Sequence, residues 1–457
     1  MKSNVSKLYH STIVAALGGL LFGFDTAVIS GTTGDLQNYF KLTEAMLGFT
    51  VATALLGTMA GSLAVGRPTD LWGRKRVLLM LAVFYLISAI GSGLAWDLYS
   101  FWFFRFLGGI AVGGASVVSP MYIAEIAPAE MRGRLVGWQQ FNVCFGICLA
   151  YISNYVVALC PLIADDPASP MAQWRWMLLM MAVPALAFLV LLFRIPESPR
   201  WLVERKRFDE ARRTLDSLGC AQTDETLAEI VDSMHGDFDA AHAHLWRRSM
   251  AIPIITALML AVFNQFSGIN ALLYYAPKVF TMGGSDTKTA LLQSVPIGIM
   301  LVIGTMIGLV LIDRLGRRKL LMAGSVGMAA ALGGVGYVFS RMQPGESVSG
   351  SIMWLFIAYL LFFGPSTGAV IWVYISEIFP NRVRAKGQAL GSFAVWVSCA
   401  LVSQAFPPAA AHPSVGPARC FYFFAICMLV QAVFVWKVMP ETRGVSLEAL
   451  QKKLGID

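Results

Sequence analysis

Two charged residues lie inside long apolar segments of this sequence. Asp25 is the only charged residue between Ile13 and Ile29, and Arg105 is the only one between residues 101 and 118. Inside a bilayer, a lone carboxylate or guanidinium costs about 3 kcal/mol unless it is paired or hydrated, so such residues usually mark ion or proton pathways. A carboxylate in this setting can take up and release a proton, and a nearby guanidinium can set its affinity for that proton.

The depths of these two residues predict that they meet. If the first spanning segment runs outward and ends near Gly31, Asp25 lies roughly 9 Å from its outer end at about 1.5 Å per residue. If the fourth segment enters from the outside near Ser100, Arg105 lies about 7.5 Å below the same surface. An ion pair that only fixes helix packing is the alternative interpretation.

The composition indicates an all-α membrane protein. Hydrophobic residues make up 57% of the chain and charged residues 14%, whereas a soluble domain carries roughly 25% charged residues. Twelve apolar segments have the length of about 20 residues that a spanning helix needs, at about 10–31, 46–65, 77–95, 100–124, 134–159, 174–194, 251–282, 290–312, 319–340, 352–376, 386–407 and 420–438. No cleavable signal peptide is expected, because the first apolar run is too long and lacks a small-residue cleavage site.

Positive charges predict the orientation of these segments. Lys and Arg gather in alternate loops and in the long connection at 195–249; the loop clusters are Arg67, Arg74, Lys75 and Arg76; Arg132 and Arg134; Arg314, Arg317, Arg318 and Lys319; and Arg382, Arg384 and Lys386. By the positive-inside rule, both termini and the long connection are cytoplasmic. The net charge of +8 is explained in this way, and basic residues scattered over short loops do not indicate nucleic-acid binding.

The chain repeats a charged pattern at about half its length. Arg74, after the second span, recurs as Arg317 after the eighth, 243 residues later, and Glu125 recurs as Glu377, 252 residues later. This repeat predicts two six-helix halves at 1–194 and 251–440, a cytoplasmic helical linker at 195–250 and a cytoplasmic tail at 441–457. Parallel halves of this kind hold a substrate between them near the midplane and rock around it. In the linker, 208–218 and 227–234 have amphipathic helical spacing.

The repeated charges predict a cytoplasmic gate. Bidentate bonds between an arginine and a carboxylate are strong enough to hold neighbouring helix ends together and weak enough to break in each cycle. The gate residues are Asp70, Arg74, Glu125, Arg132 and Arg134 in the first half and Asp313, Arg317, Glu377 and Arg384 in the second. The alternative is that these charges only fix the topology.

Several longer motifs carry a family resemblance that covers nearly the whole chain. They are Gly23-Phe-Asp25-Thr-Ala-Val-Ile-Ser-Gly31, the two Gly-Arg-Arg/Lys loops, Pro196-Glu-Ser-Pro-Arg200-Trp-Leu202, Asn264-Gln265-Phe-Ser-Gly268-Ile-Asn270 and Pro440-Glu-Thr-Arg-Gly444. With these motifs the chain resembles the sugar porters of the major facilitator superfamily, and especially the bacterial sugar–proton symporters. The resemblance implies two pseudo-symmetric halves and a bundle of short cytoplasmic helices that begins at Pro196.

The resemblance also implies roles for individual residues. Proton-coupled members have an aspartate at the position of Asp25, facing an arginine that matches Arg105, whereas facilitative carriers have a neutral residue there. Sugar-binding positions match Gln140, Asn264, Gln265, Asn270, Tyr274, Gly368, Trp372 and Trp396. Amide side chains suit neutral polyols because each offers donors and an acceptor, and the indole faces suit the C–H side of a pyranose. Glutamine and asparagine in membrane helices can instead only bond neighbouring helices.

Three positions depart from the pattern of the family. Asn264 stands where many sugar carriers have glutamine, Leu301 where they have asparagine, and Val395 where they have glutamine or asparagine. The predicted pocket has therefore lost at least two hydrogen-bond partners, and an unpaired substrate hydroxyl there costs about 1–3 kcal/mol. A sugar with a missing or inverted hydroxyl, or a less hydroxylated substrate, fits this change.

The sequence therefore predicts a proton-coupled symporter for a monosaccharide, functional as a monomer in a bacterial inner membrane. The alternatives are a proton-coupled polyol or cyclitol transporter, a sugar uniporter and a transporter-like sugar sensor. No enzyme, cofactor or metal site is expected, since no catalytic set or phosphate-cradling loop is visible and the histidines lie in loops or at helix ends, at His10, His235, His242, His244 and His412. The seven cysteines have no close-spaced pattern and fit small core residues.

Overall fold

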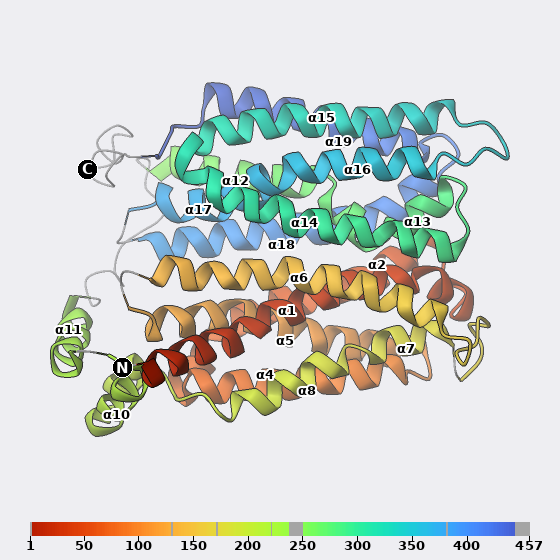
Figure 1. Ribbon diagram of the computed structural model, residues 1–457. Helices are drawn as coiled ribbons and strands as arrows, with labels where there is room; N and C mark the ends of the chain where they lie inside the picture. Colours follow the sequence, from red (N-terminus) through yellow and green to blue (C-terminus); the bar gives the residue numbers. More distant parts are fainter. Residues whose placement is uncertain are drawn as a thin grey trace. The chain divides into compact units, whose positions relative to one another are not determined.

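A computed structural model describes residues 2–128, 131–170, 172–220, 222–236, 250–380 and 383–443, without the side chains of residues 2–5, 132–134, 233–236, 313, 376, 384 and 385. Within these ranges, twelve helices are long and apolar enough to cross a membrane, and no strand is formed beyond a single bridge between Ala164 and Ala172. The all-α fold class and the twelve predicted segments are confirmed (Figure 1).

The helices follow one another with short connections. The first eight are α1 (Lys2–Tyr39), α2 (Glu44–Ala64), α3 (Gly66–Trp72), α4 (Arg74–Gly93), α5 (Leu98–Ile126), α6 (Arg132–Leu159), α7 (Gln173–Leu179) and α8 (Ala182–Leu192). Three short helices come next, α9 (Pro199–Glu204), α10 (Phe208–Leu218) and α11 (Thr223–Gly236). The remainder are α12 (Ala251–Phe266), α13 (Ile269–Met282), α14 (Thr287–Leu315), α15 (Arg317–Arg341), α16 (Ser349–Phe363), the π-helix η2 (Gly364–Gly368), α17 (Ala369–Ile378), α18 (Arg384–Ala411) and α19 (Gly416–Lys437).

The first helix is longer than the sequence predicts. It was expected to end near Gly31, but α1 continues to Tyr39. The hydroxyls of Thr32 and Thr33 donate to carbonyls three residues back, at 2.8 and 3.1 Å, so these polar groups are satisfied inside the helix. Because Tyr39 is 14 residues after Asp25, the distance of Asp25 from the end of its helix is about 21 Å rather than roughly 9 Å.

Three of the spanning segments are interrupted. The seventh breaks at Gly268, inside the Asn264–Asn270 motif, where φ is +81°, a conformation that favours glycine. The sixth was predicted as one helix but divides into α7 and α8, because Pro184 has no N–H to donate to the carbonyl of Met180. The tenth contains the π-helical turn η2, a feature that is frequent at functional sites and that the sequence did not indicate.

Two compact units can be recognised. The first comprises Met1–Val28, Thr53–Ser153 and Pro161–Phe238, and the second comprises Ile29–Ala52, Asn154–Cys160 and Asp239–Asp457. One end each of α1, α2 and α6 therefore belongs to the second unit. The domain boundaries predicted from the sequence, at 194, 251 and 440, stay predictions.

In the first unit, α4 packs along α5, α7 and α8 (Figure 1). Glycines bring the backbones of α1 and α6 together: a Cβ on Gly23 would lie 1.9 Å from the carbonyl oxygen of Val143, and one on Gly146 would lie 2.1 Å from that of Leu20. Small residues allow such close packing of helices in membranes. The turn of α1 that carries Asp25 is thereby fixed against its neighbour.

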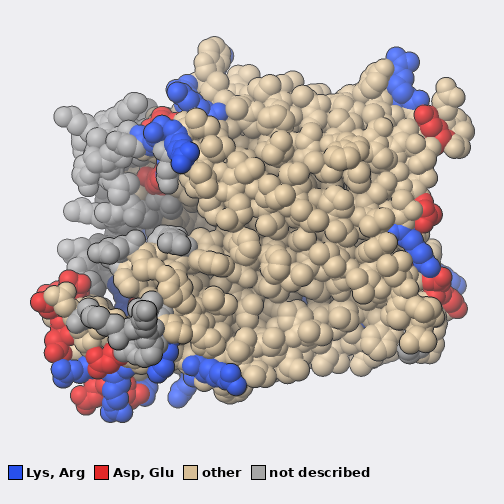
Figure 2. All heavy atoms as spheres, in the orientation of Figure 1, with Lys and Arg blue, Asp and Glu red and all other residues tan. Residues whose placement is uncertain are grey.

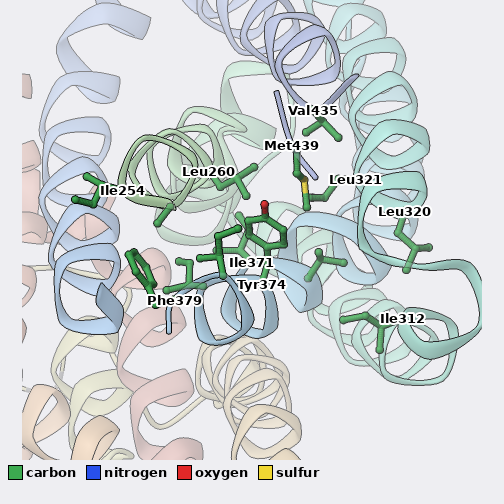
Figure 3. Packing of buried hydrophobic residues seen from close by; sticks show 14 of the residues in the cluster. Ile254, Leu260, Ile312, Leu320, Leu321, Ile371, Tyr374, Phe379, Val435 and Met439 are labelled. Atoms are coloured by element: carbon green, nitrogen blue, oxygen red, sulfur yellow. The ribbon is translucent and has the colours of Figure 1, made fainter. Parts of the chain in front are cut away.

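In the second unit, α15 packs along α16 and α19, and α12 packs against α18 (Figure 1). A buried hydrophobic cluster joins α12, α17 and α19, and Figure 3 shows Leu260, Ile371, Tyr374, Val435 and Met439 turned toward one another in it. This packing fixes α17, which follows η2, relative to the helices around it.

Charged side chains have a simple distribution on the helices. On the face drawn in Figure 2, they gather toward the helix ends, and the long middle parts of the helices carry few or none. This is the distribution that a hydrocarbon layer imposes on spanning helices. The short helices α9 to α11 are different, because they carry many charges and share only a small apolar cluster around Trp201, Leu202, Val203 and Ala211.

Candidate functional site

Asp25 and Arg105 form a buried ion pair in the first unit. Arg105 on α5 donates from Nη1 to Oδ1 of Asp25 at 2.5 Å and from Nη2 to Oδ2 at 3.3 Å. The two residues are 7% and 1% exposed. Arg105 Nε is buried and has no hydrogen-bond partner among the described residues. The carboxylate therefore has a charge partner and little access to water.

A tyrosine that the sequence analysis did not identify supports this pair. Tyr85 on α4 is buried, and its hydroxyl donates to the carbonyl of Leu21 at 2.5 Å. Leu21 lies one turn before Asp25 on α1, so the bond fixes the turn from which the carboxylate projects. Nothing in the spacing of the sequence connects Tyr85 to Asp25, because the two residues lie on different helices.

The first of the repeated charge clusters is a network of five residues, which we call the Arg74 cluster: Gly73, Arg74, Glu125, Glu197 and Ser198. Arg74 is 4% exposed and donates from Nη2 and Nε to Oε1 of Glu125, at 2.8 and 3.1 Å. Oε1 of Glu197 accepts from the backbone N–H groups of Arg74 and Lys75, each at 3.0 Å, at the first turn of α4. Ser198 donates to the other oxygen of Glu125.

The second unit repeats this network in the Arg317 cluster, which comprises Gly316, Arg317, Glu377, Glu441 and Thr442. Arg317 Nη2 donates to Glu377 Oε1 at 2.8 Å, and Thr442 donates to the other oxygen at 2.6 Å. Glu441 accepts from the backbone N–H groups of Arg317 and Arg318 at 3.0 Å. The pairing of each arginine with its expected glutamate is therefore present in the geometry of both units.

Glycine is required just before the two helices, α4 and α15, whose first N–H groups bond to Glu197 and Glu441. Gly73 and Gly316 have φ of +92° and +87°, and a Cβ on either would lie 2.5 or 2.8 Å from a carboxylate oxygen of Glu197 or Glu441. Only glycine therefore lets the carboxylate reach the unpaired N–H groups that begin every helix. Burial raises the pKa of Glu197, against the backbone bonds and the Arg74 charge, which lower it.

The roles of Glu197 and Glu441 were not predicted from the sequence. A signal was present, because a Pro-Glu-Ser/Thr motif follows the sixth span and recurs after the twelfth. Of the remaining predicted gate residues, Asp70 contributes its backbone carbonyl, which accepts from Trp201 Nε1 and Arg205 Nη2 at 2.8 Å. The other four have side chains outside the described part of the structure: Arg132, Arg134, Asp313 and Arg384.

Three of the predicted sugar-binding amides form one chain of hydrogen bonds in the second unit. Asn270 donates to Gln265 Oε1, Gln265 donates to Asn264 Oδ1 at 2.7 Å, and Asn264 donates to the backbone carbonyl of Thr367 in η2 at 3.4 Å. A backbone carbonyl can only accept, so this anchor orients every amide in the chain. Asn270, at the far end, keeps its Oδ1 and one N–H for another partner.

Gln431 on α19 adds a further contact to this chain that sequence reasoning missed. It is fully buried, its Nε2 donates to Oγ1 of Thr367 at 3.4 Å, and its Oε1 has no partner among the described residues. A buried amide with one unused acceptor is costly. Its position indicates that it holds η2, and through η2 the amide chain.

The remaining predicted sugar-binding residues lie on five different helices, with the π-helix η2 counted among them. Tyr274 is buried one turn after Asn270 on α13, Gly368 ends η2, and Trp372 on α17 is 40% exposed. Trp396 lies on α18. Gln140 belongs to the first unit, where its amide contacts Cys144 Sγ at 3.9 Å.

The two apolar positions that depart from the family pattern, Leu301 on α14 and Val395 on α18, are both buried. Neither carries a polar atom on its side chain, so neither adds a hydrogen-bond partner to the second unit.

Comparison with known proteins identifies the family of the chain. The family model for sugar (and other) transporters matches residues 11–454. The D-xylose–proton symporter of Escherichia coli K12 is 37% identical, over 98% of this chain and 96% of its own. The glucose transport protein of Synechocystis is 36% identical, over 98% of both.

Among solved structures, the E. coli xylose transporter in a partially occluded inward-open conformation matches with a TM-score of 0.84 and 35% identity, over 96% of this chain and all of the other. Together with the family model and the repeated halves of the sequence, these matches show that the chain belongs to the sugar transporter family of the major facilitator superfamily.

Proposed function

We propose that the protein is a secondary active transporter that carries a monosaccharide and a proton together across a membrane by alternating access. The observation that carries this proposal is the buried pair of Asp25 and Arg105 inside spanning helices. Its family membership and its similarity to proteins named as xylose–proton symporters support the same function.

Asp25 is the proton-coupling group in this proposal. Arg105 favours the charged carboxylate, whereas the loss of water around it favours the protonated form. A change in the distance between α1 and α5 during the cycle therefore changes the affinity of Asp25 for a proton. Tyr85 keeps the turn of α1 in place, so that the change falls on the ion pair.

The amide chain of Asn264, Gln265 and Asn270 is the centre of the sugar site. It offers a fixed acceptor and donor at Asn270, which suit the hydroxyl of a neutral sugar. Tyr274, Gly368, Trp372 and Trp396 complete the proposed site in the second unit, and Gln140 is the sugar-binding residue that the family resemblance assigns to the first unit. The relatives carry names of pentose and hexose transporters, which favour a monosaccharide over a polyol or cyclitol.

The Arg74 and Arg317 clusters act as the two cytoplasmic gates in this proposal. Each cluster ties the start of one helix to the end of another through a charged and partly buried network. Arg132, Arg134, Asp313 and Arg384 extend these gates. In this proposal the clusters and both chain termini face the cytoplasm, as the positive-inside rule favours, and the protein works as a monomer in a bacterial inner membrane.

Uptake measurements test the proposal. Purified protein in liposomes with an imposed pH gradient is offered D-xylose, D-glucose and L-arabinose in turn. Accumulation of at least one sugar that disappears with a protonophore supports symport, and the Asp25→Asn variant is the control that should lose it. Accumulation of no sugar in the panel, or accumulation that is indifferent to the protonophore, would contradict the proposal.

A further inference from the structure

Three polar side chains form a closed triad in the second unit. Lys278 on α13 donates from Nζ to Oε2 of Glu44 at 2.6 Å and to Oε1 of Gln37 at 3.0 Å. Gln37 on α1 donates in turn to the other oxygen of Glu44, on α2, at 2.9 Å. The ion pair is partly shielded, with side-chain exposures of 14% for Lys278 and 28% for Glu44. All three residues lie in the same compact unit.

The triad holds a segment that follows a weak point in its helix. Tyr275, inside α13, has non-helical φ and ψ of −128° and 16°, and Pro277 follows it. Proline removes a backbone hydrogen bond and kinks a helix. Lys278 is the first residue after this proline, so the triad ties the segment of α13 beyond the kink to α1 and α2. The Tyr275 hydroxyl donates to the carbonyl of Ser403 at 2.8 Å, which holds the kink itself.

Helix α2, which carries Glu44, is held against α18. Gln404 on α18 donates to the carbonyl of Ala45 at 2.9 Å. A Cβ on Gly48 would lie 2.4 Å from the carbonyl oxygen of Gln404, so α2 and α18 are in close contact here. Glu44 therefore lies on a helix that is held against α18, and Lys278 lies on the segment of α13 beyond the kink.

The triad lies at the opposite helix ends from the Arg317 cluster. Helix α14 begins at Thr287, soon after the end of α13, and ends at Leu315, beside Arg317. The two networks are thus separated by the full length of a spanning helix.

We propose that Lys278, Glu44 and Gln37 form a lock that holds the outer part of α13 closed at this end and must open in each transport cycle. The inference rests on the proposed alternating-access function. A lysine suits such a lock, because its ammonium is strongly hydrated and leaves a carboxylate readily when water enters. For a partly exposed pair with two hydrogen bonds to charged groups, we expect about a three- to tenfold change in the population of open states.

Hydrogen exchange on the purified full-length chain tests the lock without any sugar or proton gradient. In Lys278→Met and Glu44→Gln, backbone amides at 278–284 should exchange about three- to tenfold faster than in the wild type. Lys288→Met, which removes an exposed lysine at the start of α14, should leave that segment unchanged. The charge-swapped pair Glu44→Lys with Lys278→Glu should restore slow exchange.

Unchanged exchange in both single variants would overturn the lock, as would a swapped pair that exchanges as fast as the singles. Lys278→Arg keeps the charge and, because a guanidinium binds a carboxylate at least as firmly as an ammonium, should exchange no faster than the wild type. This variant keeps the test valid if a neutral variant does not fold. Failure of sugar uptake in the liposome assay would remove the proposed function and leave the exchange result intact. The two claims therefore fail separately.

Discussion

Removing either member of the Asp25–Arg105 pair should destabilise the protein far more than removing both. Arg105 is 1% exposed and Asp25 7%, so Asp25→Leu leaves a buried guanidinium without its carboxylate, and Arg105→Met leaves a buried carboxylate. Losing one partner of a buried ion pair costs about 3–5 kcal/mol, whereas replacing both by apolar groups of similar size is often neutral or stabilising.

The expected loss of stability corresponds to a shift in the melting temperature. An unfolding entropy of about 2 cal/mol/K per residue gives a shift of about 1 °C per kcal/mol for a chain of this length. Each single variant should therefore melt about 3–5 °C below the wild type, and the double variant within about 2 °C of it. Tryptophan fluorescence during heating in detergent at neutral pH measures all four proteins.

The informative quantity is the difference between the melting shift of the double variant and the sum of the two single shifts. A double variant that melts as low as the sum of the two single shifts would mean that the charges do not interact in the folded protein. Single variants that melt with the wild type would mean that both groups are hydrated. Either result would refute the assignment of a buried, mutually compensating pair.

Three other predictions concern the gates and the sugar site. Arg74→Ala or Arg317→Ala should favour states that are open at the cluster end, and spin-label distances across that end should lengthen; unchanged distances in both variants would count against a gating role. Leu301→Asn with Val395→Gln should add up to two hydrogen bonds worth about 0.5–1.5 kcal/mol each, and each bond made should strengthen binding of glucose or xylose about three- to tenfold relative to the native substrate. Titration calorimetry that finds equal shifts for all ligands would show that these side chains do not face the sugar. Burial raises the pKa of Glu197 in the folded protein above that of an ordinary carboxyl group. The free energy of unfolding should therefore fall as the pH rises from the ordinary carboxyl pKa through the raised pKa. In a plot of melting temperature against pH, Glu197→Gln should abolish this fall.

Much of the architecture could be predicted because it depends on local composition. Twelve apolar segments of spanning length, a glycine in the middle of the seventh and a repeated charge pattern are all visible in one dimension. The pairing of Arg74 with Glu125 and of Arg317 with Glu377 could also be expected, since the repeat itself suggested that these charges belong together.

The features that were missed depend on contacts between distant parts of the chain. Tyr85 supports Asp25 through a bond to Leu21, and Gln431 reaches Thr367 from the last spanning helix. Neither contact leaves a periodic signal. The extension of α1 to Tyr39 was missed for another reason, because threonines that bond their own helix look like a polar loop in the sequence.

The most direct test of symport follows protons rather than sugar. Liposomes that contain the purified protein and a pH-sensitive dye receive a sugar that the wild type accumulates, with no pH gradient imposed. The wild type should acidify the lumen as sugar enters. Asp25→Asn should still exchange labelled sugar across the membrane but move no protons. Sugar-driven acidification of normal size in Asp25→Asn would contradict the assignment of Asp25 as the coupling group.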